Sequence, residues 1–311
     1  MDIIRETNFQ NLGELKHGKV RDMYIQRDRL LLVSTDRHSS FDRIIAHIAN
    51  KGAVLNLSSA FWFGKTQDIV KNHVLEIPDP NVTVAKRVKP LAVEAVMRGY
   101  LTGTTSTSIW TRYRNGERQF GDLILADGLK KNTKLPHPVF DPTTKEDTHD
   151  RALSPAGLVA EGFVTQERMD RVKATALALF ARGQAIAAEH GLILVDTKYE
   201  FGVDEHGELL LIDEIHTPDS SRYWKLGSHE ARTAKGEEPE YFDKEFLRLW
   251  FKAHSDPYQD AVLPQAPAAM VAELSRRYIE IYEQLTGEKF RVDQNEDPLS
   301  RMEKNLRKYR V

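Results

Sequence analysis

The sequence predicts an α+β fold in which antiparallel sheets precede a helical C-terminal segment. Short strand patterns fill the first part of the chain, and one amphipathic helix pattern at residues 165–190 runs directly into a hairpin pattern at residues 192–215. From residue 243 onward, apolar residues recur at helical spacing. We therefore expect a small antiparallel N-terminal lobe at residues 1–95, a larger α+β lobe at residues 96–235, and a C-terminal helical segment at residues 236–311 packed on the larger lobe.

The composition limits the classes of partner. The chain has 311 residues, with 46 acidic and 44 basic side chains, so no overall field recruits nucleic acid. It has no cysteine, which excludes disulfides and thiolate metal sites. No apolar run approaches the roughly 18 residues of a membrane span, and the N-terminus lacks the apolar part of a signal peptide. We expect a cytoplasmic protein with small-molecule substrates, as a monomer or homodimer.

The N-terminal elements follow from their apolar patterns. Residues 19–26 and 29–34 read as strands around a turn at Arg27-Asp28, and further strands are expected near Val74 and at residues 82–88. Residues 54–70 carry large apolar side chains at the spacing of a packed helix. We assign its aromatic residues to the core.

Residues 13–20, GELKHGKV, match the glycine-lysine spacing of a P-loop. Val20 stands where Ser or Thr should bind Mg²⁺, and a strand pattern follows in place of a helix, so we reject that interpretation. Instead, Lys19 and Arg21 alternate with apolar or acidic residues and project from one strand face, where they can cover polyphosphate oxygens. A solvated hairpin face is the alternative.

Three further segments have the composition of binding loops, and one of them, Asp219-Ser220-Ser221-Arg222, follows Pro218 directly beyond the acidic hairpin. Residues 34–42, STDRHSSFD, follow a strand and contain Asp36, Ser39 and Asp42. Residues 97–104 combine Arg98 with flexible glycines and Thr104, which suits a phosphate or carboxylate. Beyond these, residues 97–110 and 126–162 read as long loops.

The helix at residues 165–190 has Thr165 as its N-cap and ends at Gly191. It leads into residues 191–224, which hold eight carboxylates and only two cations around two buried-strand patterns. If the hairpin loop is His206-Gly207, Glu200 lies opposite Asp213, and only a one-residue slip separates the two acids. A bound divalent cation would explain such a pair, and oxygen ligands favour Mg²⁺. Neutralisation by Lys198 without a metal is the alternative.

Histidines offer no recognisable catalytic arrangement. His149-Asp150 and His216 lack a serine elbow, an HExxH motif or clustered spacing. We expect them at the surface or in supporting positions.

Seven segments between residues 16 and 224 form a distinctive set of motifs. They read GKVRDMY (18–24), STDRHSSFD (34–42), KGAVLNLSSAFWF (51–63), RGYLTGT (98–104), TKEDTHD (144–150), VDTKYEFG (195–202) and DEIHTPDSSRYW (213–224). Together, and in this order, they resemble the SAICAR synthetase family, in its longer type.

The resemblance implies a two-lobed, ATP-grasp-like enzyme of purine biosynthesis. It would join the carboxylate of carboxyaminoimidazole ribonucleotide (CAIR) to the amine of L-aspartate, with ATP giving ADP and phosphate. Lys19 and Lys198 would be catalytic, and ATP would be bound by Lys19, Arg21 and Lys86. Glu200 and Asp213 would hold Mg²⁺. The substrate residues would be Asp36, Ser39, Asp42, Arg98, Thr104, Asp219, Ser221 and Arg222.

The sequence departs from the family pattern in three places. Thr104 stands where many relatives have Ser, residues 105–109 look longer than usual, and TKEDTHD looks shorter. Two other functions fit parts of the pattern. A small-molecule kinase would need a hydroxyl acceptor and a general base, whereas a ligase needs extra arginines for two anionic substrates. A regulatory nucleotide-binding protein would not need both metal carboxylates.

Overall fold

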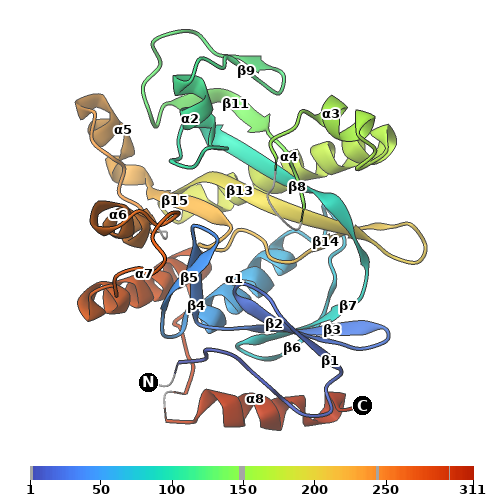
Figure 1. Cartoon of the computed structure of the whole chain (residues 1–311). Helices are drawn as coiled ribbons and strands as arrows, with labels where there is room; N and C mark the ends of the chain where they lie inside the picture. The colour runs from blue at the N-terminus through green and yellow to red at the C-terminus, as the bar shows by residue number, and fades with distance from the viewer. Residues whose placement is uncertain (1–2, 147–150, 243–244, 294) are drawn as a thin grey trace.

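Two antiparallel sheets with helices around and between them make up the computed structural model (Figure 1), which describes residues 3–146, 151–242, 245–293 and 295–311. The first sheet has five strands in the order β1-β2-β3-β7-β6. Its members are β1 (Glu14–His17), β2 (Arg21–Ile25), β3 (Arg29–Ser34), β6 (Val74–Asp79) and β7 (Val82–Lys86). The predicted N-terminal strands are thereby confirmed. The strand predicted at residues 19–26 corresponds to β2, which begins two residues later than expected.

The second sheet has six strands. Its main path is β11-β8-β13-β14, with β12 paired to β8 and β15 paired to β13. The strand β13 lies between neighbours on both sides and is buried along nearly its whole length, which explains its run of Leu, Ile and Val. The bounds are β8 (Lys89–Tyr100), β11 (Lys134–Phe140), β12 (Thr143–Thr144), β13 (Leu192–Val203), β14 (Leu209–Ile212) and β15 (Ser221–Lys225).

Two short hairpins stand apart from these sheets. The strands β4 (Arg37–Ser40) and β5 (Arg43–His47) form one of them, and β9 (Gln119–Phe120) and β10 (Leu123–Ile124) form the other. Phe41 and Asp42, at the turn of the first hairpin, both have a positive φ of 57°.

Helices fix the sheets relative to one another. The helix α1 (Lys51–Lys65) contacts β3, β7 and the C-terminal helix α7 (Ala268–Thr286). The helix α4 (Gln166–Glu189) covers β13 and β8, and the Thr165 side chain caps it by accepting a hydrogen bond from the amide of Arg168, as predicted. The remaining helices are α2 (Ile109–Arg114), α3 (Pro155–Ala160), α5 (Leu226–Lys235), α6 (Glu245–His254), α8 (Pro298–Leu306) and a 3₁₀ turn (Arg307–Tyr309).

The prediction of long loops at residues 97–110 and 126–162 was only partly right: residues 101–108 and 126–133 lie between elements, but the rest of these segments contains regular structure. The strand β8 continues to Tyr100, and β11, β12, α2 and α3 occupy parts of these segments. Pro136 and Pro138 obscured β11 in the sequence, but β11 lies at the edge of the sheet, where missing amide donors are tolerated.

The last helix does not follow the predicted packing on the larger lobe. The side chains of Met302, Leu306 and Tyr309 join the apolar cluster of the five-stranded sheet. Arg301 of α8 is buried and pairs with Asp79 of β6. The C-terminus thus closes one face of the N-terminal sheet, below it in Figure 1. Among the described helices, none has the length and apolar character needed to cross a membrane.

Candidate active site

A cluster of charged side chains lies where the two longest strands of the six-stranded sheet pair. Glu200 of β13 stands directly opposite Glu94 of β8. The Nζ of Lys198 lies 2.8 Å from Glu94 Oε1 and 2.5 Å from Glu200 Oε1, and Lys145 pairs with the other oxygen of Glu200. Facing carboxylates repel one another across a strand pair, so these two lysines stabilise the arrangement.

The charge state of Lys198 follows from the carboxylates that surround its ammonium group. Burial alone would lower its pKa, but the carboxylates of Glu200, Asp213 and Glu94 hold the pKa of Lys198 well above its ordinary value. The ammonium group is therefore a permanent positive charge at the centre of the sheet.

Arg21 connects the five-stranded sheet to this cluster. Its Nη2 lies 2.9 Å from Asp213 Oδ1 and 3.5 Å from Glu214 Oε1, and its Nη1 donates a hydrogen bond to the Asp213 carbonyl at 3.2 Å. Burial would raise the pKa of Asp213, but Arg21, Lys198 and Lys145 lower it. Burial raises the pKa of the neighbouring Glu214. Asp213 is thus the member of this pair that is held ionised.

The predicted strand register was wrong by one residue. Glu200 lies opposite Ile212, not opposite Asp213, and its like-charged partner across the sheet is Glu94 on the other side. Asp213 lies just beyond β14 with a φ of 69°, so the alternation of the strand no longer sets its direction. Glu200 and Asp213 nevertheless both interact with Arg21 and Lys198.

A cavity of about 270 Å³ opens at the same end of the sheet. Asp196 of β13 is in register with Arg98 of β8 and with Arg222 of β15, so these three residues form a row across three strands. Arg222 pairs with Asp196, and Arg98 Nε lies 2.5 Å from Asp141 Oδ2. The walls consist of Val96, Arg98, Thr105, Asp196, Thr197, Lys198, Pro218, Asp219, Ser220, Ser221, Arg222 and Arg248.

The cavity therefore brings together five predicted residues, namely Arg98, Lys198, Asp219, Ser221 and Arg222. In the loop after β8, Thr105 lines the wall, whereas the predicted Thr104 precedes it.

Asp219 is held from two directions. Its Oδ2 lies 2.6 Å from Nζ of Lys51 on α1, and its Oδ1 accepts a hydrogen bond from the hydroxyl of Tyr278 on α7 at 2.6 Å. Lys51 and Tyr278 are fully buried. The C-terminal helix thus contributes to the position of a predicted substrate residue.

The remaining predicted residues lie outside the walls of this cavity. Lys19 is exposed and pairs with Asp42 at 2.6 Å, and Lys86 pairs with Asp204 in the β13–β14 turn at 3.0 Å. Ser39 lies half-buried on β4.

Asp36 is 1% exposed and accepts hydrogen bonds from the amides of Ile4 and Gly52, both at 3.0 Å. Burial raises its pKa, while these amides act in the opposite direction. Its observed contacts anchor the start of α1.

His216 occupies a supporting position, as expected. Its Nε2 lies 2.5 Å from the Tyr199 hydroxyl, and burial lowers its pKa to about 3. His149 and Asp150 lie outside the described residues.

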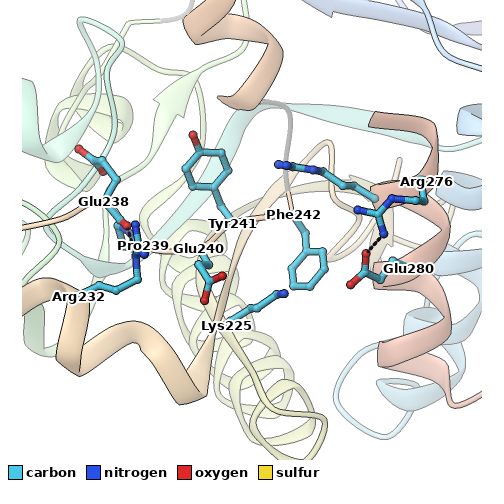
Figure 2. A pocket seen from close by; sticks show the side chains of 10 residues that line it. Lys225, Arg232, Glu238, Pro239, Glu240, Tyr241, Phe242, Arg276 and Glu280 are labelled. Carbon is cyan, nitrogen blue, oxygen red and sulfur yellow. Dashed lines mark hydrogen bonds and ion pairs between the residues drawn. The ribbon is translucent and has the colours of Figure 1, made fainter. Parts of the chain in front are cut away.

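A separate cavity of about 340 Å³ lies between α5, residues 238–242 and α7. Figure 2 shows Arg276 paired with Glu280 at its wall, at 2.8 Å. Arg276 also pairs with Glu273, so acidic neighbours already compensate this cation. This cavity contains none of the predicted site residues.

The sequence of this chain is similar to those of known proteins. A sequence model described as SAICAR synthetase matches residues 14–265. The chain belongs to the SAICAR synthetase family. It is 54% identical over 288 residues to the phosphoribosylaminoimidazole-succinocarboxamide synthase of Legionella pneumophila (strain Lens), covering 93% of this chain and 92% of the relative. The chloroplastic enzyme of Arabidopsis thaliana is 53% identical over 282 residues, covering 91% of this chain and 69% of that protein.

Solved structures of SAICAR synthetases share the fold. The SAICAR-synthase from Saccharomyces cerevisiae, complexed with SAICAR, superimposes with a TM-score of 0.79 at 32% identity, covering 93% of this chain and 100% of the other. A SAICAR synthetase in complex with ADP gives a TM-score of 0.68 at 24% identity, covering 90% of this chain and 100% of the other. The mixed architecture with antiparallel sheets is thus confirmed.

The sequence patterns did not reveal several residues of the candidate site. Glu94 faces Glu200 but sits in a segment without any acidic cluster, and Asp141 lies in a stretch read as loop. Arg248 lines the cavity from α6, far along the chain. Residues 91–97, LAVEAVM, are apolar apart from Glu94, and this run is the signal that could have identified β8 as a strand carrying one acidic side chain.

Proposed function

We propose that this chain is an ATP-dependent carboxylate–amine ligase of purine biosynthesis that makes SAICAR from CAIR and L-aspartate. The observation that carries the proposal is the junction of two features on one sheet. The Glu94–Lys198–Glu200 cluster offers charges for phosphoryl transfer, and the row of Arg98, Asp196 and Arg222 beside it suits a phosphorylated, anionic substrate. Membership of the SAICAR synthetase family supports the same reaction.

The chemistry begins with activation of a poor acylating agent. A carboxylate oxygen of CAIR attacks the γ-phosphorus of ATP, and the bond from that phosphorus to the bridging oxygen breaks, which releases ADP. The aspartate amine then attacks the acyl carbon, loses a proton and expels phosphate. Because phosphoryl transfer depends mainly on positioning and neutralisation of charge, Lys198 is the central catalytic cation in this proposal.

We place ATP between the two sheets. Arg21 reaches from β2 to Asp213, and Lys19 precedes the same strand. Lys86 bridges to the β13–β14 turn through Asp204. Opening of the exposed Lys19–Asp42 pair would release Lys19 toward phosphate oxygens. We also propose that the chain divides into three parts, with boundaries at residues 95 and 235. The same proposal includes a fold related to that of ATP-grasp enzymes.

Glu200 and Asp213 fit Mg²⁺ in this scheme. Their carboxylates supply only oxygen donors, which Mg²⁺ prefers, and Mg²⁺ commonly takes one or two protein carboxylates together with substrate phosphates. Within the described residues, no three His, Cys, Asp or Glu side chains form a metal cluster, so substrate phosphates would have to complete the coordination of the ion. The bound ion would neutralise charge on the phosphates during transfer.

The test measures ADP release from the purified protein with Mg²⁺-ATP and CAIR, with and without L-aspartate. We expect release to require aspartate and to fall by about a hundredfold or more in Glu200→Gln, which lacks a charged ligand at the site. Glu205→Gln is the matched control, because Glu205 is exposed in the β13–β14 turn, and it should retain full activity. Release without aspartate, equal in wild type and Glu200→Gln, would point to a kinase-like activity and overturn the proposal.

A further inference from the structure

A chain of ion pairs holds Arg98 at the wall of the substrate cavity. The Nε of Arg98 donates a hydrogen bond to Asp141 Oδ2 at 2.5 Å, and its Nη2 donates one to the carbonyl of Thr107 at 3.1 Å. Within the described residues, the remaining nitrogen, Nη1, has no hydrogen-bonding partner in the protein. Because Arg98 lines the cavity, two of its nitrogens are fixed by the protein and the third is left for a bound anion.

Asp141 is shared between two arginines. Its backbone amide donates a hydrogen bond to the carbonyl of Val96 on β8 at 2.9 Å, which keeps its main chain beside Arg98. From the other side, Nη1 of Arg112 on α2 lies 2.7 Å from Asp141 Oδ1 and 2.9 Å from Oδ2. The carboxylate is buried between these two guanidinium groups, and Arg98 takes only one of its oxygens.

The position of Arg112 is set by the core around α2. Ile109 and Tyr113 of this helix are buried in an apolar cluster with Phe120, so the rotation of α2 about its axis is fixed. The Cζ of Arg112 lies 4.9 Å from the ring centroid of Phe120, in the range of a cation–π contact. Its Nε and Nη2 hold the two oxygens of Glu117 at 2.9 and 2.5 Å. Arg112 thus uses all three nitrogens within the protein.

We infer that Arg112 is a positioning residue for the phosphorylated substrate, because it holds Asp141 and thereby fixes the orientation in which Arg98 meets that substrate. The inference rests on the proposed function. The walls of the cavity do not include Arg112, so Arg112 acts on the substrate through the other two residues.

The competition for Asp141 explains how Arg112 acts. An arginine and a carboxylate commonly pair through two parallel hydrogen bonds. Arg112 occupies Oδ1 of Asp141, so this carboxylate holds Arg98 through Oδ2 alone. Without Arg112, both oxygens are open to Arg98, and the guanidinium turns toward Asp141 and away from its orientation in the cavity wall.

The test measures steady-state rates of the full-length protein while CAIR, ATP and L-aspartate are varied in turn, and thermal unfolding checks that each variant is folded. In Arg112→Met we expect the KM for CAIR to rise by about tenfold, while kcat and the KM values for ATP and aspartate change by less than about twofold. Arg112→Lys should keep most of this rise, because one ammonium group does not replace a fork that holds Glu117 and Asp141 together. Arg114→Met, at an exposed position of the same helix, is the matched control and should behave as wild type.

A double-mutant cycle separates positioning from support of the fold. Asp141→Asn removes the carboxylate through which Arg112 acts, so adding Arg112→Met to it should raise the KM for CAIR by less than about twofold further. Independent, multiplying effects of the two substitutions would overturn the inference.

Two other results would also overturn it. If Arg112→Met lowers the melting temperature but leaves the KM for CAIR unchanged, Arg112 only stabilises α2. If the KM for ATP or for aspartate rises in place of that for CAIR, Arg112 does not act through Arg98 on the phosphorylated substrate. Should Arg112→Met not fold, Arg112→Lys carries the same comparisons. Failure of the proposed function is distinguishable, because wild type itself would then show no aspartate-dependent release of ADP.

Discussion

His216 shows how burial of one residue connects the site to the stability of the protein. Burial lowers the pKa of His216 from 6.5 to about 3. The unfolded chain therefore binds a proton near pH 6.5 that the folded chain does not bind until about pH 3. Since the unfolded state holds more protons throughout this window, stability falls as pH decreases from 6.5 toward 3. Burial also lowers the pKa of His73 to about 3, so His73 contributes to the pH dependence in the same direction.

We predict that His216→Asn weakens this pH dependence. Asn tolerates the positive φ of 51° at this position, and its shorter side chain removes both the titratable ring and the contact of Nε2 with Tyr199. Between pH 7 and pH 5 the variant should lose about 2 kcal/mol less unfolding free energy than wild type, because one differential protonation is removed. Denaturant unfolding at pH 7, 6 and 5 measures this difference. His206→Asn, at an exposed turn, is the control, and an unchanged slope in His216→Asn would contradict the prediction.

At the level of single residues, much of the site was accessible from the sequence. Arg98, Lys198, Asp219, Ser221 and Arg222 were predicted as site residues and meet at one cavity. The pairing of Glu200 with Glu94 could not be predicted from the sequence, because the hairpin pattern revealed only one neighbour of β13. The strand on its other side, β8, lies about a hundred residues earlier in the chain, and a local pattern does not encode such a pairing.

At the level of elements, α4 makes a close contact with β13 and the loop that carries His216. A Cβ atom built on Gly183 would lie 2.4 Å from Cε1 of His216 and 2.7 Å from Cδ2 of Leu194. Only a residue without a side chain allows this approach. Glycine weakens a helix interior, so its presence here reflects the packing of α4 against β13 and the loop that carries His216.

We therefore predict that Gly183→Ala destabilises the protein by about 1–3 kcal/mol, although alanine favours the helix by about 1 kcal/mol. Gly64→Ala in α1 is the matched control, because no heavy atom lies within 4 Å of its added Cβ. That control should be neutral or slightly stabilising. Chemical denaturation of both variants measures the contrast, and equal stabilisation of the two would show that the close approach is not rigid.

The strong periodic elements were predictable, and the irregular ones were not. The strand β3 matches its predicted range, and α4 begins after Thr165, because repeating apolar spacing and a cap act locally. The prolines of β11 and the glycines and threonines near the end of β8 carry local loop signals. Pairing with a neighbouring strand overrides such signals, as the antiparallel register of β8 with β11 and β13 shows.

At the level of the whole molecule, Arg301 fastens the C-terminal helix to the first sheet. Its guanidinium reaches Asp79 at 2.9 and 3.1 Å and Asn81 at 2.7 Å, and the Asp79 side chain is completely buried. We predict that Arg301→Met destabilises the protein by about 3–5 kcal/mol, because it leaves a buried carboxylate without its cation.

Thermal and denaturant unfolding test this prediction, with Arg310→Met as the control. Arg310 pairs with Glu303 at the surface, so its loss should change stability by less than about 1 kcal/mol. If both variants unfold alike, the buried pair contributes no more than the surface pair.

The position of α8 also has a consequence for synthesis on the ribosome. The apolar cluster beneath the first sheet combines Tyr24, Leu31 and Val84 with Met302, Leu306 and Tyr309. The strands of this sheet emerge early, whereas the side chains that cover them are translated last. At a typical rate of about 5–20 residues per second, the exposed sheet would wait at least about ten seconds for its cover. The strands of the N-terminal sheet are thus synthesised first, but the apolar face of this sheet is the last to be buried.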